Sequence, residues 1–92
     1  MEEFRERLNA IDAQLLELFL ARMRVAKDIG YYKKENALPI EDPKREEQII
    51  ARMCRGIDPE AAYYVQDYFE ELFALSKDIQ RAIADGEEPA EF

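Results

Sequence analysis

The amino-acid sequence predicts an all-α fold of three helices, one of them very long. Apolar residues recur at intervals of three and four over three segments, which is the period of a helix. Alternation with a period of two never continues long enough to indicate a strand. At 92 residues the chain has the length of a single domain with a small core.

The first predicted helix runs from about Glu2 to about Asn36. At about 1.5 Å per residue it would be roughly 50 Å long, which exceeds the diameter of a small domain. Two shorter helices cannot cover its whole surface, so we expect a second copy of the chain to cover the rest. Gly30 lies inside this helix, where a close helix crossing, a nearby ligand or plain tolerance would each explain it. The face directed at the core comprises Leu8, Ile11, Leu15, Leu18, Arg22, Ala26, Ile29 and Lys33.

Two Asp-Pro pairs predict where the other helices begin. Asp42-Pro43 supplies an N-cap and a first-turn proline to a second helix that ends near Gly56. Asp58-Pro59 does the same for a third helix that continues to about Gly86. The acidic residues that follow, 87–92, are expected to form a disordered tail, which leaves residues 1–86 as the domain.

The charge of the chain limits its partners. It carries 13 Lys and Arg against 21 Asp and Glu, a net charge of -8, so it has no overall basic field to attract nucleic acid or an anionic membrane. An anion would have to be bound locally, in a pocket. No apolar run approaches the roughly 20 residues needed to span a bilayer, and the acidic start is unlike a signal peptide. We therefore expect a cytoplasmic protein that binds neither nucleic acid nor membrane.

Histidine is absent and Cys54 is the only cysteine. Imidazole metal sites, Cys/His and Ser/His nucleophile pairs and an intrachain disulfide are thereby excluded. Cys54 is interpreted as a small core residue because apolar residues surround it in the sequence.

Polar residues interrupt the apolar faces of all three predicted helices: Arg22 and Lys33 in the first, Glu46 in the second, Ser76 and Gln80 in the third. Burying an unpaired cation costs several kcal/mol, so an anion is expected to meet each one. One interpretation is a structural ion-pair network in which Glu46 answers Arg22 or Lys33. However, two cations face one carboxylate, and a small anionic ligand would complete the balance.

Arg5 tests that second interpretation. It lies 17 residues before Arg22, about 25 Å along the helix and turned by roughly 100°. The two cannot hold one small molecule within a single chain. Either two chains share each site, or Arg5 is a solvated cation near a helix start.

The order and spacing of these residues resemble the all-helical chorismate mutases over nearly the full chain. The segments that carry the resemblance are Arg5 to Asp12, Leu15-Leu16, Arg22, Gly30, Lys33, Pro39 to Glu46, and Ser76 with Gln80. The resemblance implies an intertwined homodimeric helical bundle with two equivalent sites, each completed by Arg5 of the other protomer.

The implied activity is that of an isomerase of the shikimate pathway, which converts chorismate to prephenate for phenylalanine and tyrosine biosynthesis without metal or cofactor. By resemblance, Arg22 and the other protomer's Arg5 bind the substrate carboxylates, while Lys33 and Gln80 donate to the ether oxygen. Glu46 accepts from the ring hydroxyl. Asp42, Arg45 and Ser76 complete the substrate-binding set, although Asp42 is also the helix cap.

At two positions this chain differs from some relatives, and both differences bear on this interpretation. Some carry a glutamate at the position of Gln80, and that glutamate must be protonated to donate, whereas Gln80 donates at any pH. Relatives can also carry a basic residue where this chain has Glu41, which would weaken the attraction of a dianion.

Two alternatives stay open at the level of sequence. Similar proteins of the same fold eliminate pyruvate from isochorismate. The chain could also be a non-catalytic, acidic dimerisation or regulatory module, whose buried charges only set helix register.

Overall fold

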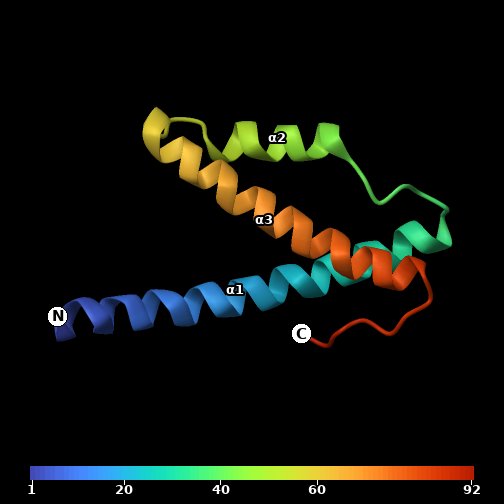
Figure 1. Ribbon diagram of the computed structural model, residues 1–92, viewed down its shortest axis with the longest axis horizontal. Coiled ribbons are helices and arrows are strands. Elements are labelled where there is room, and N and C mark those ends of the chain that lie inside the picture. The colour runs from blue at the N-terminus through green and yellow to red at the C-terminus, as the bar shows by residue number, and fades with distance from the viewer.

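The computed structural model describes all 92 residues and contains three α-helices and no strand (Figure 1). These helices are α1 (Glu2–Glu35), α2 (Pro43–Met53) and α3 (Pro59–Ala84). The predicted all-α fold is confirmed, and so is the great length of the first helix.

Local capping fixes where α2 and α3 begin. The side chain of Asp42 accepts a hydrogen bond from the backbone N–H of Arg45 at 3.2 Å, and that of Asp58 from the N–H of Glu60 at 3.2 Å. A proline follows each cap, as the sequence predicts. α2 ends at Met53, three residues before the expected Gly56, because the chain already turns there and Gly56 adopts a left-handed φ of 74°.

α3 is the central element of the fold. It crosses the C-terminal half of α1 on one side and contacts α2 on the other, while α1 and α2 do not pack on each other (Figure 1). The molecule is consequently flat, with extents of 49 × 29 × 13 Å. Its small core lies where α1 crosses α3 and comprises Met23, Ala26, Leu72, Phe73 and Ile83.

Gly30 is explained by this crossing. A Cβ at residue 30 would lie 2.9 Å from Cδ1 of Ile83 and 3.2 Å from Cγ of Gln80. Contacts below 3.0 Å do not occur without displacement of the neighbour. Of the three explanations that the sequence allowed, the close approach of α1 to α3 is therefore the one the structure supports.

The first half of α1 lies uncovered in the single chain. Leu8, Leu15 and Leu18 belong to the face predicted to point at the core, yet they are 57%, 45% and 67% exposed. Only 9 of the 92 residues are buried, because α3 covers only the C-terminal half of α1. None of the three helices combines the length and the apolar character that crossing a membrane requires.

Residues 87–92 have no regular secondary structure and run back beside α1 (Figure 1). Lys27 Nζ donates to the carbonyl of Ala90 at 3.3 Å, Arg24 Nε donates to the carbonyl of Phe92, and Pro89 is buried. Disorder of this tail in solution stays a prediction. Cys54, expected in the core, is half-buried, with Sγ 3.7 Å from the carbonyl of Ala62.

Candidate functional site

A pocket of about 360 Å³ opens between the three helices, within the size range of small-molecule sites. Seven of the eight residues that the sequence suggested for a site line it together: Arg22, Lys33, Asp42, Arg45, Glu46, Ser76 and Gln80. Arg5 does not line it. Its guanidinium is exposed near the start of α1 and pairs with Glu2 at 3.0 Å.

Arg22 projects from α1 toward α3 at the floor of the pocket. Its Nη1 donates to Oγ of Ser76 at 2.7 Å, and its guanidinium lies 5.8 Å from the centre of the Phe73 ring. No carboxylate pairs with it. Burial lowers the pKa of the Arg22 guanidinium from its ordinary value, because loss of water disfavours the charged form. An anion bound here would offset that cost.

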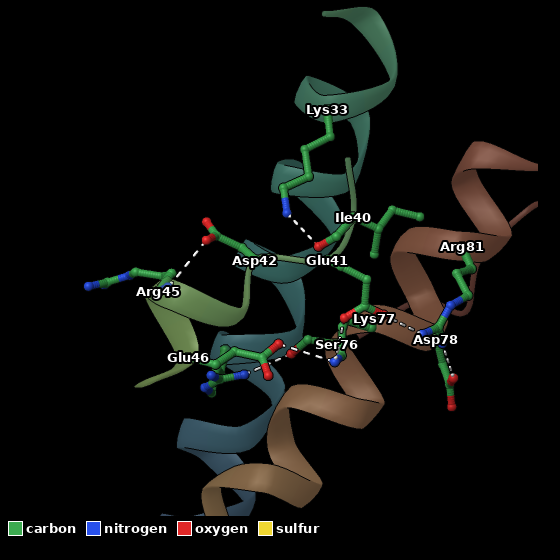
Figure 2. Close-up of polar contacts among 11 residues, drawn as sticks. Lys33, Ile40, Glu41, Asp42, Arg45, Glu46, Ser76, Lys77, Asp78 and Arg81 are labelled. Carbon is green, nitrogen blue, oxygen red and sulfur yellow. Dashed lines mark hydrogen bonds and ion pairs between the residues drawn. The ribbon is translucent and has the colours of Figure 1, made fainter. Parts of the chain in front are cut away.

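Lys33 lies three turns further along α1. Its Nζ donates to the carbonyl of Ile40 at 2.9 Å, which ties the loop between α1 and α2 to α1 (Figure 2). Lys33 forms no ion pair with any carboxylate. An ammonium has three N–H groups, so two remain for a ligand in the pocket.

Gln80 is buried on α3 at the helix crossing. Its Nε2 donates to the carbonyl of Ala26 on α1 at 3.1 Å, which fixes the orientation of the amide. The second N–H of the amide remains available to a ligand in the pocket.

Glu46 does not pair with Arg22 or Lys33, the two cations considered for it from the sequence. It pairs with Lys77 at 3.1 Å (Figure 2), and neither Arg22 nor Lys33 forms an ion pair with it. The prediction of a network in which Glu46 answers one of those two cations is therefore wrong. Both cations on α1 are left without a carboxylate.

Lys77 also lines the pocket and was not singled out from the sequence. It lies four residues after Phe73 and three before Gln80, and this helical spacing is the signal that could have placed it on the same wall. Apolar residues from all three helices and the loop complete the lining: Val25, Ala26, Ile29, Ile40, Ile49 and Phe73.

Glu41, in the loop before α2, pairs with Lys77 and with Arg81, each at 3.1 Å. The hydrogen bond from Lys77 holds the pKa of Glu41 below its ordinary value. Hydrogen bonds to Glu41 and Glu46 raise the pKa of Lys77. Two cations thus compensate the negative charge of Glu41, which the sequence suggested would repel a dianion.

Asp42 and Arg45 occupy the edge of the pocket at the start of α2. The Asp42 carboxylate is engaged as the helix cap, in line with the second role expected for it. The side chain of Arg45 is exposed and extends away from Lys77 (Figure 2).

The arrangement suits the binding of a small anion that carries a hydroxyl group. Two cations without carboxylate partners and one amide come from α1 and α3, and a carboxylate acceptor comes from α2. Neither histidine nor cysteine is among the lining residues, so the pocket offers donors and acceptors rather than a thiolate or imidazole.

A family model and two curated relatives that match this chain all carry the name chorismate mutase. The model of the family described as chorismate mutase type II matches residues 4–81. A chorismate mutase of Methanocaldococcus jannaschii is 34% identical over 58 residues, which are 60% of this chain and 59% of that protein. A bifunctional chorismate mutase/prephenate dehydratase of Aquifex aeolicus is 30% identical over 91 residues, 89% of this chain and 25% of that protein.

A solved structure is also similar. It is a conserved hypothetical protein from Pyrococcus furiosus, with 37% identity and a TM-score of 0.71, and the match covers 86% of this chain and 92% of that one. The chain spans about three fifths of the archaeal mutase and a quarter of the bifunctional enzyme.

Proposed function

The chain belongs to the chorismate mutase type II family, and from this membership together with its cationic pocket we propose that it rearranges chorismate to prephenate in aromatic amino acid biosynthesis. The observation that carries the proposal is that Arg22 and Lys33 line one pocket without a carboxylate partner. In the reaction a carbon–oxygen bond breaks as a carbon–carbon bond forms. No nucleophile is required, so holding the reactive shape and stabilising charge on the ether oxygen suffice.

Each polar residue has a role in this proposal. The Arg22 guanidinium, steadied by Ser76, binds one substrate carboxylate. Lys33 and Gln80 direct their remaining N–H groups at the ether oxygen, where negative charge develops. The free carboxylate oxygen of Glu46 accepts from the ring hydroxyl.

Loss of the Lys33 ammonium is expected to slow the chemical step. A donor to developing charge contributes about 2 to 4 kcal/mol to the barrier, so Lys33→Ala should lower kcat by roughly 30- to 1,000-fold. Lys34→Ala is the matched control, because Lys34 also donates to a backbone carbonyl, that of Ile83, at 3.0 Å but does not line the pocket. Steady-state kinetics with chorismate measure both, and similar rates for the two variants would contradict the role of Lys33.

The rate is expected to be nearly independent of pH from about 5.5 to about 9. The amide of Gln80 does not titrate. The lowered pKa of Glu41 means that its stabilising pairing is present above the ordinary value of 4.5 and is lost as pH falls through the folded-state pKa. The raised pKa of Lys77 means that its pairing is present below 10.5 and is lost as pH rises through the folded-state pKa.

A pH–rate profile of kcat/KM measures this independence. Gln80→Glu is the informative comparison: only the protonated acid donates, so its rate should fall as pH rises. A steep alkaline decline in the unaltered protein would contradict the assignment of Gln80.

The functional unit we propose is a homodimer in which Arg5 of one protomer completes the pocket of the other. The exposed apolar face of α1 supports it, and so does an apolar groove of about 340 Å³ between α1 and α3. Covering these surfaces with a second chain would bury apolar area that one chain leaves in water. Sedimentation equilibrium at micromolar concentration should give the mass of two chains, and a monomer would contradict the proposal.

We also place the protein in the cytoplasm. A single, half-buried, free cysteine is usual for a protein of a reducing compartment. Cell fractionation with an antibody against the chain tests this location, and recovery from a membrane or external fraction would contradict it.

An activity assay with chorismate tests the proposed function directly. Purified protein is mixed with chorismate, and the loss of its ultraviolet absorbance is followed while the product is identified as prephenate by mass and chromatography. Isochorismate is tested in parallel. Release of pyruvate from isochorismate without turnover of chorismate would favour the lyase, and inactivity on both would favour a non-catalytic dimerisation module.

A further inference from the structure

Lys77 lies between two carboxylates that come from different parts of the chain. Its Nζ is 3.1 Å from Oε2 of Glu41, in the loop between α1 and α2, and 3.1 Å from Oε2 of Glu46 on α2 (Figure 2). The lysine side chain is only 20% exposed and that of Glu46 only 29%, so this contact is shielded from water more than a surface pair.

The packing of α2 makes this bridge important. α2 contacts α3 but not α1, and none of its residues is fully buried. The cations Arg22 and Lys33, however, project from α1. Since α3 packs on both α1 and α2, it sets the distance between the Glu46 carboxylate and those cations. Lys77 is the α3 side chain that pairs with Glu46.

Side chains of α1 and α3 hold the loop of residues 36–42 at two points, Ile40 and Glu41. Lys33 Nζ donates to the carbonyl of Ile40 at 2.9 Å, and the Glu41 carboxylate receives Lys77 on one oxygen and Arg81 on the other. Because Ile40 and Asp42 line the pocket, the second attachment holds part of the pocket wall against α3.

We propose that Lys77 is a positioning residue, which orients the Glu46 carboxylate toward the substrate hydroxyl and holds the loop of residues 36–42 against α3. Lys77 occupies Oε2 of Glu46 and leaves Oε1 to accept from the ligand. This inference rests on the proposed mutase function for the role of Glu46, but the fixing of the two carboxylates is a property of the protein without substrate.

Kinetics test the first half of the inference. Since Glu46 contacts the hydroxyl in the ground state and the transition state alike, Lys77→Met should raise KM about tenfold while kcat changes by less than about threefold. Lys77→Arg should restore KM to within about threefold, because a guanidinium can bridge both carboxylates. Lys44→Met is the matched control: Lys44 is exposed at the start of α2, forms no ion pair and does not line the pocket.

A double-mutant cycle separates positioning from a general effect on the fold. If Lys77 acts through Glu46, adding Lys77→Met to Glu46→Gln should change KM by less than about twofold beyond the single Glu46→Gln variant. An equal increase of KM in both backgrounds would overturn the proposed orientation of Glu46, because Lys77 would then affect substrate binding independently of Glu46. An unchanged KM in the single Lys77→Met variant would overturn it as well.

Hydrogen exchange without substrate tests the second half. The hydrogen-bonded amides of Leu38, Arg45 and Glu46 should exchange about tenfold faster in Lys77→Met than in the unaltered protein, while Lys44→Met should leave them unchanged. Equal exchange in all three proteins would overturn the inference whatever the activity. If the unaltered protein leaves chorismate intact, only the proposed function fails.

Discussion

Arg22→Ala should remove almost all of the proposed turnover of chorismate without changing the fold or the assembly state of the protein. The Arg22 guanidinium is half-buried, and no carboxylate of the chain pairs with it. In the proposed complex it would bind a substrate carboxylate in a partly desolvated pocket. Truncating one member of such a pair costs about 3 to 5 kcal/mol, which corresponds to a loss of roughly two to four orders of magnitude in kcat/KM.

Two further variants separate substrate binding by Arg22 from a general effect of losing an arginine. Arg24→Ala removes the same side chain two residues further along α1, outside the pocket, and should retain activity. Arg22→Lys keeps the charge but not the planar fork, so an intermediate rate is expected. Circular dichroism and sedimentation monitor fold and assembly. Unfolding of Arg22→Ala would make the arginine structural, and an activity no lower than that of Arg24→Ala would contradict its assignment to substrate binding.

In the proposed homodimer Arg5→Ala should be as severe, although the Arg5 guanidinium is exposed in the single chain, and mixing with a second variant should restore activity. In a mixed dimer of Arg5→Ala and Arg22→Ala chains, one site receives both intact arginines and the other receives neither. Equal amounts, unfolded and refolded together, give half mixed dimers with one working site of two. Activity should return to about a quarter of that of the unaltered protein.

A second mixture controls for this rescue. Arg22→Ala with Lys33→Ala combines two defects that both belong to the protomer's own half of the site, so no mixed dimer contains an intact site. No activity should return in that case. If the first mixture also fails although mixed dimers form, each pocket is complete within one chain and Arg5 is a surface cation.

The starts of α2 and α3 were predictable because the chemistry that sets them is local. An aspartate followed by a proline supplies a side-chain acceptor and a fixed φ, and both act on the next few residues. The end of α2 was less predictable. A left-handed glycine at residue 56 marks the turn but not how far the helix unwinds before it, and Met53 is the last helical residue.

The candidate site was largely predictable for a different reason. Arg22, Glu46 and Gln80 each interrupt an apolar face, and apolar faces of packed helices must converge, so polar residues upon them converge too. Which charges pair could not be predicted in the same way. Helical spacing could place Lys77 on the pocket wall, but only the placement of α2 and the loop before it across α3 brings Glu46 and Glu41 to Lys77.

Gly30 shows how a residue without a side chain can constrain its neighbours. One methyl group at that position would press on Ile83 and on the Cγ of Gln80, the residue proposed to donate to the ether oxygen. The Ile83 methyl group can turn aside, whereas Cα of Gln80, at 3.3 Å from the added carbon, belongs to the backbone of α3, so residues 30 and 83 are coupled through this crossing. A homologue with alanine at the first should carry a smaller side chain at the second, or place its donor from a different point on the helix.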